Sequence, residues 1–255
     1  MDTNIIDLKA LFTTPCVSRE MINPQYWIKR TTAVKKIILN EKQIWKFNQK
    51  TFQKMKNNDW QKALFDLKGY PDIISRKDLL EIMSEYSSKK LISKKRYNCN
   101  GKEISEQEKN HIIEMTNITA IPDKIQVRFG ILVKKQNLRA LPDNIIFAPS
   151  PDEIDIDLFQ LTSLSANSPV AVLHESKNKE WAYIQSTIYQ GWVKKDSIAF
   201  VKNRAEIFDF IESPNFLLVT GSRIETEPNP FNSLISNIKY QMGDILPLAD
   251  VNEIP

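Results

Sequence analysis

The stretch YIQSTIYQGWVKKDSIAF, residues 183–200, decides the fold of this chain. A Gly-Trp-Val run at 191–193 leads into a strand-like segment, and Tyr189 stands just before it. Glycine inside a strand pattern often marks a tight bend at the corner of a barrel. We therefore expect a small β-barrel in which Trp192 and Val193 pack inside and Tyr189 presents an exposed ring.

The segments around this stretch have the spacing of further short strands. Residues 168–176 and 181–188 are rich in β-branched and aromatic residues, and a polar turn separates them. Residues 124–142 alternate, which predicts one buried face made of Ile125, Val127, Phe129, Ile131 and Val133. Several short strands joined by short polar turns are typical of a barrel closed on itself.

The chain upstream of this barrel has helical patterns instead. Residues 25–60 and 75–91 place apolar side chains at helical steps, with lysines between them. Ser75 is a candidate N-cap with Asp78 in the first turn, and Ser105 with Glu108 has capping-box spacing. Residues 1–23 are expected to form an extended arm, because Pro15 and Pro24 interrupt any regular element.

The C-terminal stretch NFLLVTGSRIETEPNP, residues 215–230, repeats the strand-turn-strand pattern of residues 124–142. It opens a second barrel, but only 40 residues run from Phe216 to Pro255. A barrel of this type needs on the order of 55–65 residues. We therefore predict an α+β chain with an arm and helical segment at 1–120, a first SH3-like barrel at 121–203 and a partial second SH3-like barrel at 204–255.

Composition limits the possible functions. The 255 residues are 42% hydrophobic and 26% charged, which is ordinary for a globular protein. Residues 1–139 hold 27 basic and 15 acidic side chains, whereas residues 140–255 hold 8 and 16, so a basic half precedes an acidic half. No run of eighteen apolar residues predicts a membrane span, and the N-terminus has no signal-peptide pattern.

No catalytic, metal or cofactor motif is visible. Cys16 and Cys99 are far apart and could form one disulfide only in an oxidising compartment, and two free thiols are the plainer alternative. His111 and His174 are isolated, and we expect both to have packing or turn roles. Lysines are spread around the predicted helices, and aromatic residues at helical spacing favour a core, so nucleic-acid binding is not expected.

A resemblance to a known family follows from particular residues. Residues 138–200 resemble the first bacterial SH3 domain of cell-wall hydrolases that carry an NlpC-type catalytic domain. The matching pieces are Leu138-Arg139 with Leu141-Pro142, Asp157 with Phe159-Gln160, Pro169-Val170 with Val172-Leu173-His174, Trp181 and Gly191-Trp192-Val193. Upstream, MINPQYWIKR at 21–30 is similar to the family's N-terminal helical segment, and LLVTGSRIETEPNP and YQMGDILPL resemble the start of a second SH3 domain.

The resemblance implies a function without catalysis in this chain. Such enzymes cleave γ-D-glutamyl-diamino acid bonds in peptidoglycan stem peptides, but the Cys-His catalytic domain that follows the second barrel is not found here. The implied role is recognition of the stem peptide, with Asp157 and Tyr189 meeting its free amino end, in support of a catalytic domain in cis or in trans. The implied location is the periplasm or cell envelope, if a signal peptide was removed.

Two alternatives remain open at this point. The barrel is also compatible with an adaptor that binds a Pro-rich or extended peptide along an aromatic groove. The second alternative is a structural docking protein that would use the basic half as its docking face. No cofactor is expected under any of the three.

Overall fold

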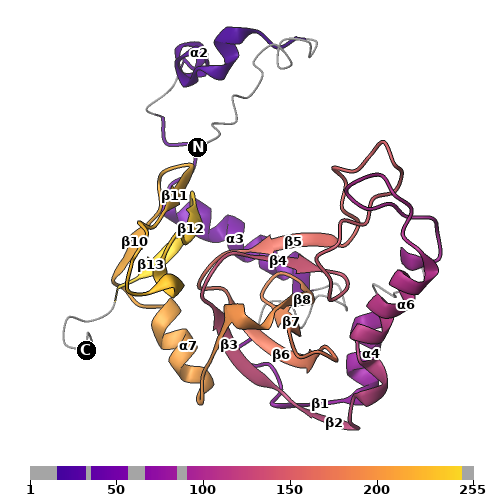
Figure 1. Cartoon of the computed structure of the whole chain (residues 1–255). Helices are drawn as coiled ribbons and strands as arrows, with labels where there is room; N and C mark the ends of the chain where they lie inside the picture. Colours follow the sequence, from indigo (N-terminus) through magenta and orange to yellow (C-terminus); the bar gives the residue numbers. More distant parts are fainter. Residues whose placement is uncertain (1–15, 33–35, 57–66, 85–90, 249–255) are drawn as a thin grey trace. The chain divides into compact units, whose positions relative to one another are not determined.

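The computed structural model describes residues 16–32, 36–56, 67–84 and 91–248, and the chain divides into two compact units, 1–56 and 57–255 (Figure 1). The described part of the first unit holds three helices: η1 (Arg19–Ile22), α2 (Pro24–Arg30) and α3 (Glu41–Lys56). Most of the predicted arm at 1–23 lies outside the described residues. The helical pattern of residues 25–60 is therefore confirmed where the structure describes it.

The aromatic residues of α3 do not form the core that their spacing favours. Trp45 and Phe47 keep 61% and 63% of their surface exposed. In α2, Asn23 caps the helix, because its Oδ1 accepts the backbone N–H of Gln25 at 2.9 Å, and Pro24 stands at the first helical position. Helix α2 thus has local signals for its start but no buried side chain.

The second unit begins with β1 (Ile73–Ser75) and α4 (Arg76–Ser84), followed by α6 (Glu106–Met115) and η3 (Ile118–Ala120). Both predicted caps are confirmed: Ser75 Oγ accepts the N–H of Asp78 at 3.1 Å, and Ser105 and Glu108 form a reciprocal capping box. Helix α4 presents Leu79 to the interior, where it is fully buried. The predicted helix at 75–91 is described only to Ser84, since residues 85–90 lie outside the described part.

The alternating run at 124–133 is divided between two sheets. Strand β2 (Lys124–Gln126) pairs antiparallel with β1, and β3 (Arg128–Leu132) enters the large sheet. Val127 joins them, and its N–H donates to the carbonyl of Asp72 at 2.8 Å. The buried face is confirmed for Ile125, Val127 and Phe129, but Val133 is 44% exposed because β3 ends at Leu132.

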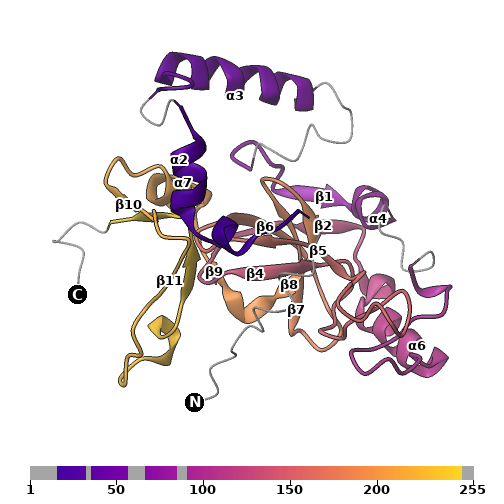
Figure 2. The ribbon, with the colours of Figure 1, turned by 90° about the horizontal axis from the view of Figure 1, so that it is seen from above.

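The large sheet has seven antiparallel strands in the order β5-β4-β8-β7-β6-β3-β9 (Figure 2). The remaining strands are β4 (Gln136–Arg139), β5 (Gln160–Leu164), β6 (Pro169–Glu175), β7 (Trp181–Ser186), β8 (Gln190–Lys194) and β9 (Ile198–Phe200). The 3-10 turn η4 (Lys195–Ser197) joins β8 to β9. Strand β4 pairs with β5 over its length but meets β8 through one residue pair, Arg139 and Trp192.

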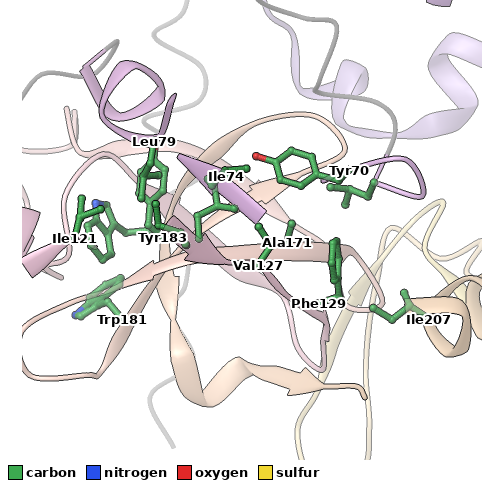
Figure 3. Packing of buried hydrophobic residues seen from close by; sticks show 14 residues of the cluster. Tyr70, Ile74, Leu79, Ile121, Val127, Phe129, Ala171, Trp181, Tyr183 and Ile207 are labelled. Atoms are coloured by element: carbon green, nitrogen blue, oxygen red, sulfur yellow. The ribbon is translucent and has the colours of Figure 1, made fainter. Parts of the chain in front are cut away.

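One core joins the helical segment to this sheet (Figure 3). Leu79 of α4 and Ile74 of β1 pack with Phe129, Tyr183 and the other members of the cluster, which also include Tyr70, Ile121, Trp181 and Trp192. Trp192 and Val193 are 1% and 0% exposed, but they lie on opposite faces of β8. The prediction that they fill the barrel is confirmed for Val193, whereas Trp192 packs on the face that meets the helical segment. A second cluster on the other side of the sheet contains Val193 and Ile184.

Residues 204–248 do not extend the seven-stranded sheet. Helix α7 (Arg204–Ile211) buries Ile207 in the first core, and four short strands follow: β10 (Phe216–Leu218), β11 (Arg223–Glu225), β12 (Lys239–Gln241) and β13 (Ile245–Pro247). A 3-10 turn, η5 (Ser233–Ile235), lies between β11 and β12. Strand β10 pairs with β13, and β11 pairs with β12. The fold is α+β as predicted, while the division at 120 and 203 remains a prediction.

Candidate functional site

Asp157 is held by a nearly buried ion pair. The guanidinium of Arg139, at the end of β4, donates from Nη1 to Asp157 Oδ2 at 2.7 Å, and the two side chains are 5% and 18% exposed. The other nitrogens of Arg139 donate to the carbonyl oxygens of Asp143 and Ile145. Arg139 therefore fastens the long β4–β5 connection onto the barrel.

The second carboxylate oxygen of Asp157 closes the same connection. Its Oδ1 accepts the backbone N–H of Phe147 at 3.2 Å and that of Phe159 at 3.0 Å. Phe147 and Phe159 stack with a centroid distance of 4.1 Å, and both are fully buried. An ionised carboxylate has about four acceptor positions. Three are occupied within the chain, so Asp157 has room for one further donor.

Tyr189 lies in the β7–β8 turn, three residues before Trp192, which is the strand partner of Arg139. Its backbone N–H donates to Ser186 Oγ at 3.0 Å, and its carbonyl accepts the Ser186 hydroxyl at 2.6 Å. The side chain is partly buried against the cluster that contains Val193, whereas Asp157 bonds to members of the Phe147 cluster. Hydrogen bonds within the chain therefore hold both predicted site residues in place, Asp157 beside the Phe147 cluster and Tyr189 against the Val193 cluster.

Sequence reasoning missed the role of Arg139. Arg139 was noted only as part of the Leu138-Arg139 pair in the resemblance. Its ion pair with Asp157 was not predicted. A basic residue inside the apolar run NLRALP, 137–142, is the signal that was available, because a buried guanidinium requires a carboxylate partner.

A cavity of about 200 Å³ lies where the helical segment meets the barrel. Leu80 and Met83 of α4 line one side, and Tyr183, Gly191 and Trp192 line the other. The rings of Tyr183 and Trp192 meet edge to face at 5.3 Å. Neither Asp157 nor Tyr189 lines this mostly apolar space, so it is separate from the predicted pair.

His174 has a packing role, as expected from the sequence. Its Nε2 lies 3.0 Å from the carbonyl oxygen of Thr116 at the end of α6, and its ring meets Trp192 edge to face at 6.0 Å. Burial lowers the pKa of His174 below its ordinary value of 6.5, although the hydrogen bonds to Thr116 and Asn117 act in the opposite direction. The neutral imidazole therefore joins α6 to the sheet.

The described residues supply little for catalysis or metal binding. Cys16 and Cys99 are both free and exposed, so no disulfide joins them. No group of three or more His, Cys, Asp or Glu side chains in the described ranges has the geometry of a metal site. None of the described helices has the length and apolar character that crossing a membrane requires.

Three large aromatic residues of β7 and β8 are buried and present no ring at the surface of the barrel. Trp181, Tyr183 and Trp192 are 3%, 3% and 1% exposed. A domain that binds Pro-rich peptides presents such rings at its surface. The predicted aromatic groove for a Pro-rich peptide therefore receives no support from these three residues.

Comparisons with known proteins agree with this architecture. Residues 147–194, which run from the Asp157 connection to the end of β8, match the family of SH3 domains of the SH3b1 type. The chain is also similar to the solved structure of an NlpC/P60 endopeptidase from Photobacterium damselae subsp. piscicida, with a TM-score of 0.63 and 20% identity. That similarity covers 84% of this chain and 48% of the endopeptidase, so the chain spans about half of its length.

No curated protein matches the chain. At 20% identity the solved structure establishes a shared fold. The match at 147–194 includes β5 to β8 and the loop that carries Asp157, which are among the parts that the sequence resemblance rested on. The chain therefore carries a bacterial SH3 domain of the SH3b1 type at 147–194, within a fold similar to part of an NlpC/P60 endopeptidase.

Proposed function

We propose that this chain is a non-catalytic recognition module for peptidoglycan stem peptides that supports an NlpC-type catalytic domain, in cis or in trans. The observation that carries the proposal is the SH3b1-type match across the strands and loop that hold Asp157 and Tyr189. The shared fold with an NlpC/P60 endopeptidase adds support. The proposal also places the protein in the periplasm or cell envelope.

Asp157 and Tyr189 are the proposed contacts for the free amino end of the stem peptide. An ammonium group would donate to the remaining acceptor position of Asp157, and the Tyr189 hydroxyl would take part from the β7–β8 turn. A hydrogen bond to a charged group contributes roughly 1.5–3 kcal/mol. Acetylation removes both the charge and the donor, so the acetylated peptide should bind more weakly.

The experiment is titration calorimetry with a stem tripeptide whose amino end is either free or acetylated. The free peptide should bind and the acetylated one should lose about tenfold in affinity, which is the lower end of that energy range. Tyr189→Phe should weaken binding of the free peptide, whereas Tyr97→Phe, a tyrosine outside the proposed contact, should not. Equal affinity for the two peptides would leave Asp157 and Tyr189 without this role.

The same samples test the absence of catalysis. We expect no release of stem-peptide fragments from purified peptidoglycan, because the described residues bring no cysteine and histidine together as nucleophile and base. Fragment release that disappears in Cys16→Ala or Cys99→Ala would contradict this part of the proposal. Binding without cleavage is the outcome that fits a supporting module.

A further inference from the structure

A groove of about 1140 Å³ separates the barrel from the C-terminal strands. The β3–β4 turn and β9 line one wall, and residues 233–239 line the other. Two hydrogen bonds join the barrel to the C-terminal strands near the groove: Lys135 Nζ donates to Gln241 Oε1 at 2.8 Å, and Asn167 Nδ2 donates to the carbonyl of Ile245 at 3.0 Å. Small-molecule sites usually measure about 300–1,000 Å³, so this groove accommodates several linked residues.

The groove is basic. Four lysines and Arg139 line it, and the single carboxylate among its described lining residues is that of Asp196; the lysines are Lys134, Lys135, Lys194 and Lys239. The charge of Arg139 is already paired with Asp157. The contact between Lys134 and Asp196, at 3.3 Å, joins two largely exposed side chains and is therefore weak. Lys135 bonds to a neutral amide, and Lys239 forms no ion pair within the described part of the chain. We call this space the basic groove.

An unpaired strand edge begins in the basic groove, which Ile198 and Ala199 line, and it ends at Phe200, which lines two other pockets. Strand β9 pairs only with β3, and it stands at the end of the sheet order. The N–H of Val133 donates to the Ser197 carbonyl, and the N–H of Val201 donates to the Phe129 carbonyl. Because strand residues alternate in direction, the backbone groups of Ile198 and Phe200 point away from β3. The Ile198 N–H bonds to the Lys195 carbonyl, which leaves the Ile198 carbonyl and both Phe200 groups at the edge.

The walls of the basic groove favour a peptide over a nucleic acid. Val133 and Ile235, which are 44% and 49% exposed, offer apolar contacts for side chains of an added strand. Trp181 also lines the groove, but it is 3% exposed and Lys194 Nζ lies 4.3 Å from the centre of its ring. Single-stranded nucleic acids are bound largely by stacking on exposed aromatic rings, and this ring is covered.

We propose that the basic groove binds an extended, acidic segment of a protein partner, which pairs with the open edge of β9. Main-chain hydrogen bonds to Ile198 and Phe200 would supply affinity, and carboxylates directed at Lys135 and Lys239 would supply specificity. Regular pairing with β9 needs α-linked L-residues, so a stem peptide with its D-residue and γ-link fits poorly. The proposal therefore concerns a different class of ligand from the one proposed for Asp157 and Tyr189, although Arg139, the partner of Asp157, also lines the groove.

The test measures fluorescence anisotropy of a labelled acetyl-Asp-Val-Asp-Val-Asp-Val-amide with the full chain. We expect saturable binding that weakens about tenfold in the double variant Lys135→Glu, Lys239→Glu, because two favourable contacts become repulsive. The matched control is Lys102→Glu, Lys124→Glu, which changes the net charge equally at exposed positions outside the groove and should bind within about twofold of the parent. Thermal melting of all three proteins checks that each is folded.

Further ligands separate the alternatives. Methylation of alternate backbone nitrogens in the acidic peptide should abolish binding, because it removes the donors that pair with β9. The same peptide with lysine in place of aspartate should not bind. Comparable binding of the methylated peptide, of a thymidine decamer or of a stem tripeptide at the same lysines would overturn the proposal. So would equal losses in the groove variant and its control, or no saturable binding of the acidic peptide.

Discussion

At the scale of single residues, Asp157 both forms the ion pair with Arg139 and is the proposed contact for the amino end of the stem peptide. Its partner Arg139 is 5% exposed, so removal of the carboxylate charge would leave a buried cation uncompensated. We expect Asp157→Asn to lower the free energy of unfolding by about 3 kcal/mol, measured by urea denaturation. Asp155→Asn, at an exposed neighbouring position, serves as the control and should change stability little. An unchanged stability in Asp157→Asn would show that Arg139 finds another partner.

His174 gives a second prediction at this scale. Because burial lowers its pKa in the folded state, the unfolded chain takes up the proton first as pH falls. The stabilisation is therefore complete above the unfolded pKa of 6.5 and is lost as pH drops through the lower folded value. Urea unfolding at pH 8 and pH 5 should show a larger loss for the parent than for His174→Gln. Parallel losses in both proteins would assign the pH effect to other groups.

At the scale of elements, the decisive contact is the crossing of β4 and β8. A Cβ added to Gly191 would lie 2.8 Å from the Arg139 carbonyl oxygen and 3.0 Å from Leu138 Cγ. Gly191→Ala should therefore separate the strands and cost about 1–3 kcal/mol of stability. The control Gly221→Ala meets only Ile224 Cγ2, at 3.3 Å, in an exposed turn. Equal melting temperatures of the two variants would contradict the role given to this crossing.

The elements also show what the sequence could and could not predict. Ser75 and Ser105 were identified as caps because their partners are local, three residues along the chain. The barrel strands followed from alternation and from the Gly-Trp-Val turn. The division of residues 124–132 between two sheets was missed, because the pairing of β2 with β1 depends on a distant strand. The same reason hid Arg139, whose partner lies 18 residues away.

At the scale of the whole molecule, the C-terminal strands differ from the barrel in burial. All three residues of β10 are about half exposed, Phe216 at 48%, Leu217 at 56% and Leu218 at 54%. In β7, by contrast, every residue from Trp181 to Ser186 is buried. The exposed apolar side chains of β10 are ones that the structural-docking alternative would use. The incomplete second barrel expected from the sequence remains a prediction.

Hydrogen exchange measures this difference. Amides of 216–225 should exchange much faster than those of 181–186, since few buried contacts oppose their local opening. High dilution excludes association between copies, and added salt weakens ion pairs such as Lys68 with Glu212. If the two segments are equally protected under both conditions, the C-terminal part is a self-sufficient domain, and the prediction of a partial barrel fails.

The direct passage from β2 into β3 through Val127 has a mechanical consequence. Strand β2 is held by β1, and β3 lies between β6 and β9, with no flexible linker between the two sheets. A pulling force applied at β1 would pass to β2 through the hydrogen bonds of their pairing, and from β2 into β3 along the backbone. The β1–β2 pair and the seven-stranded sheet would therefore bear a pulling force together and unfold together, instead of one after the other.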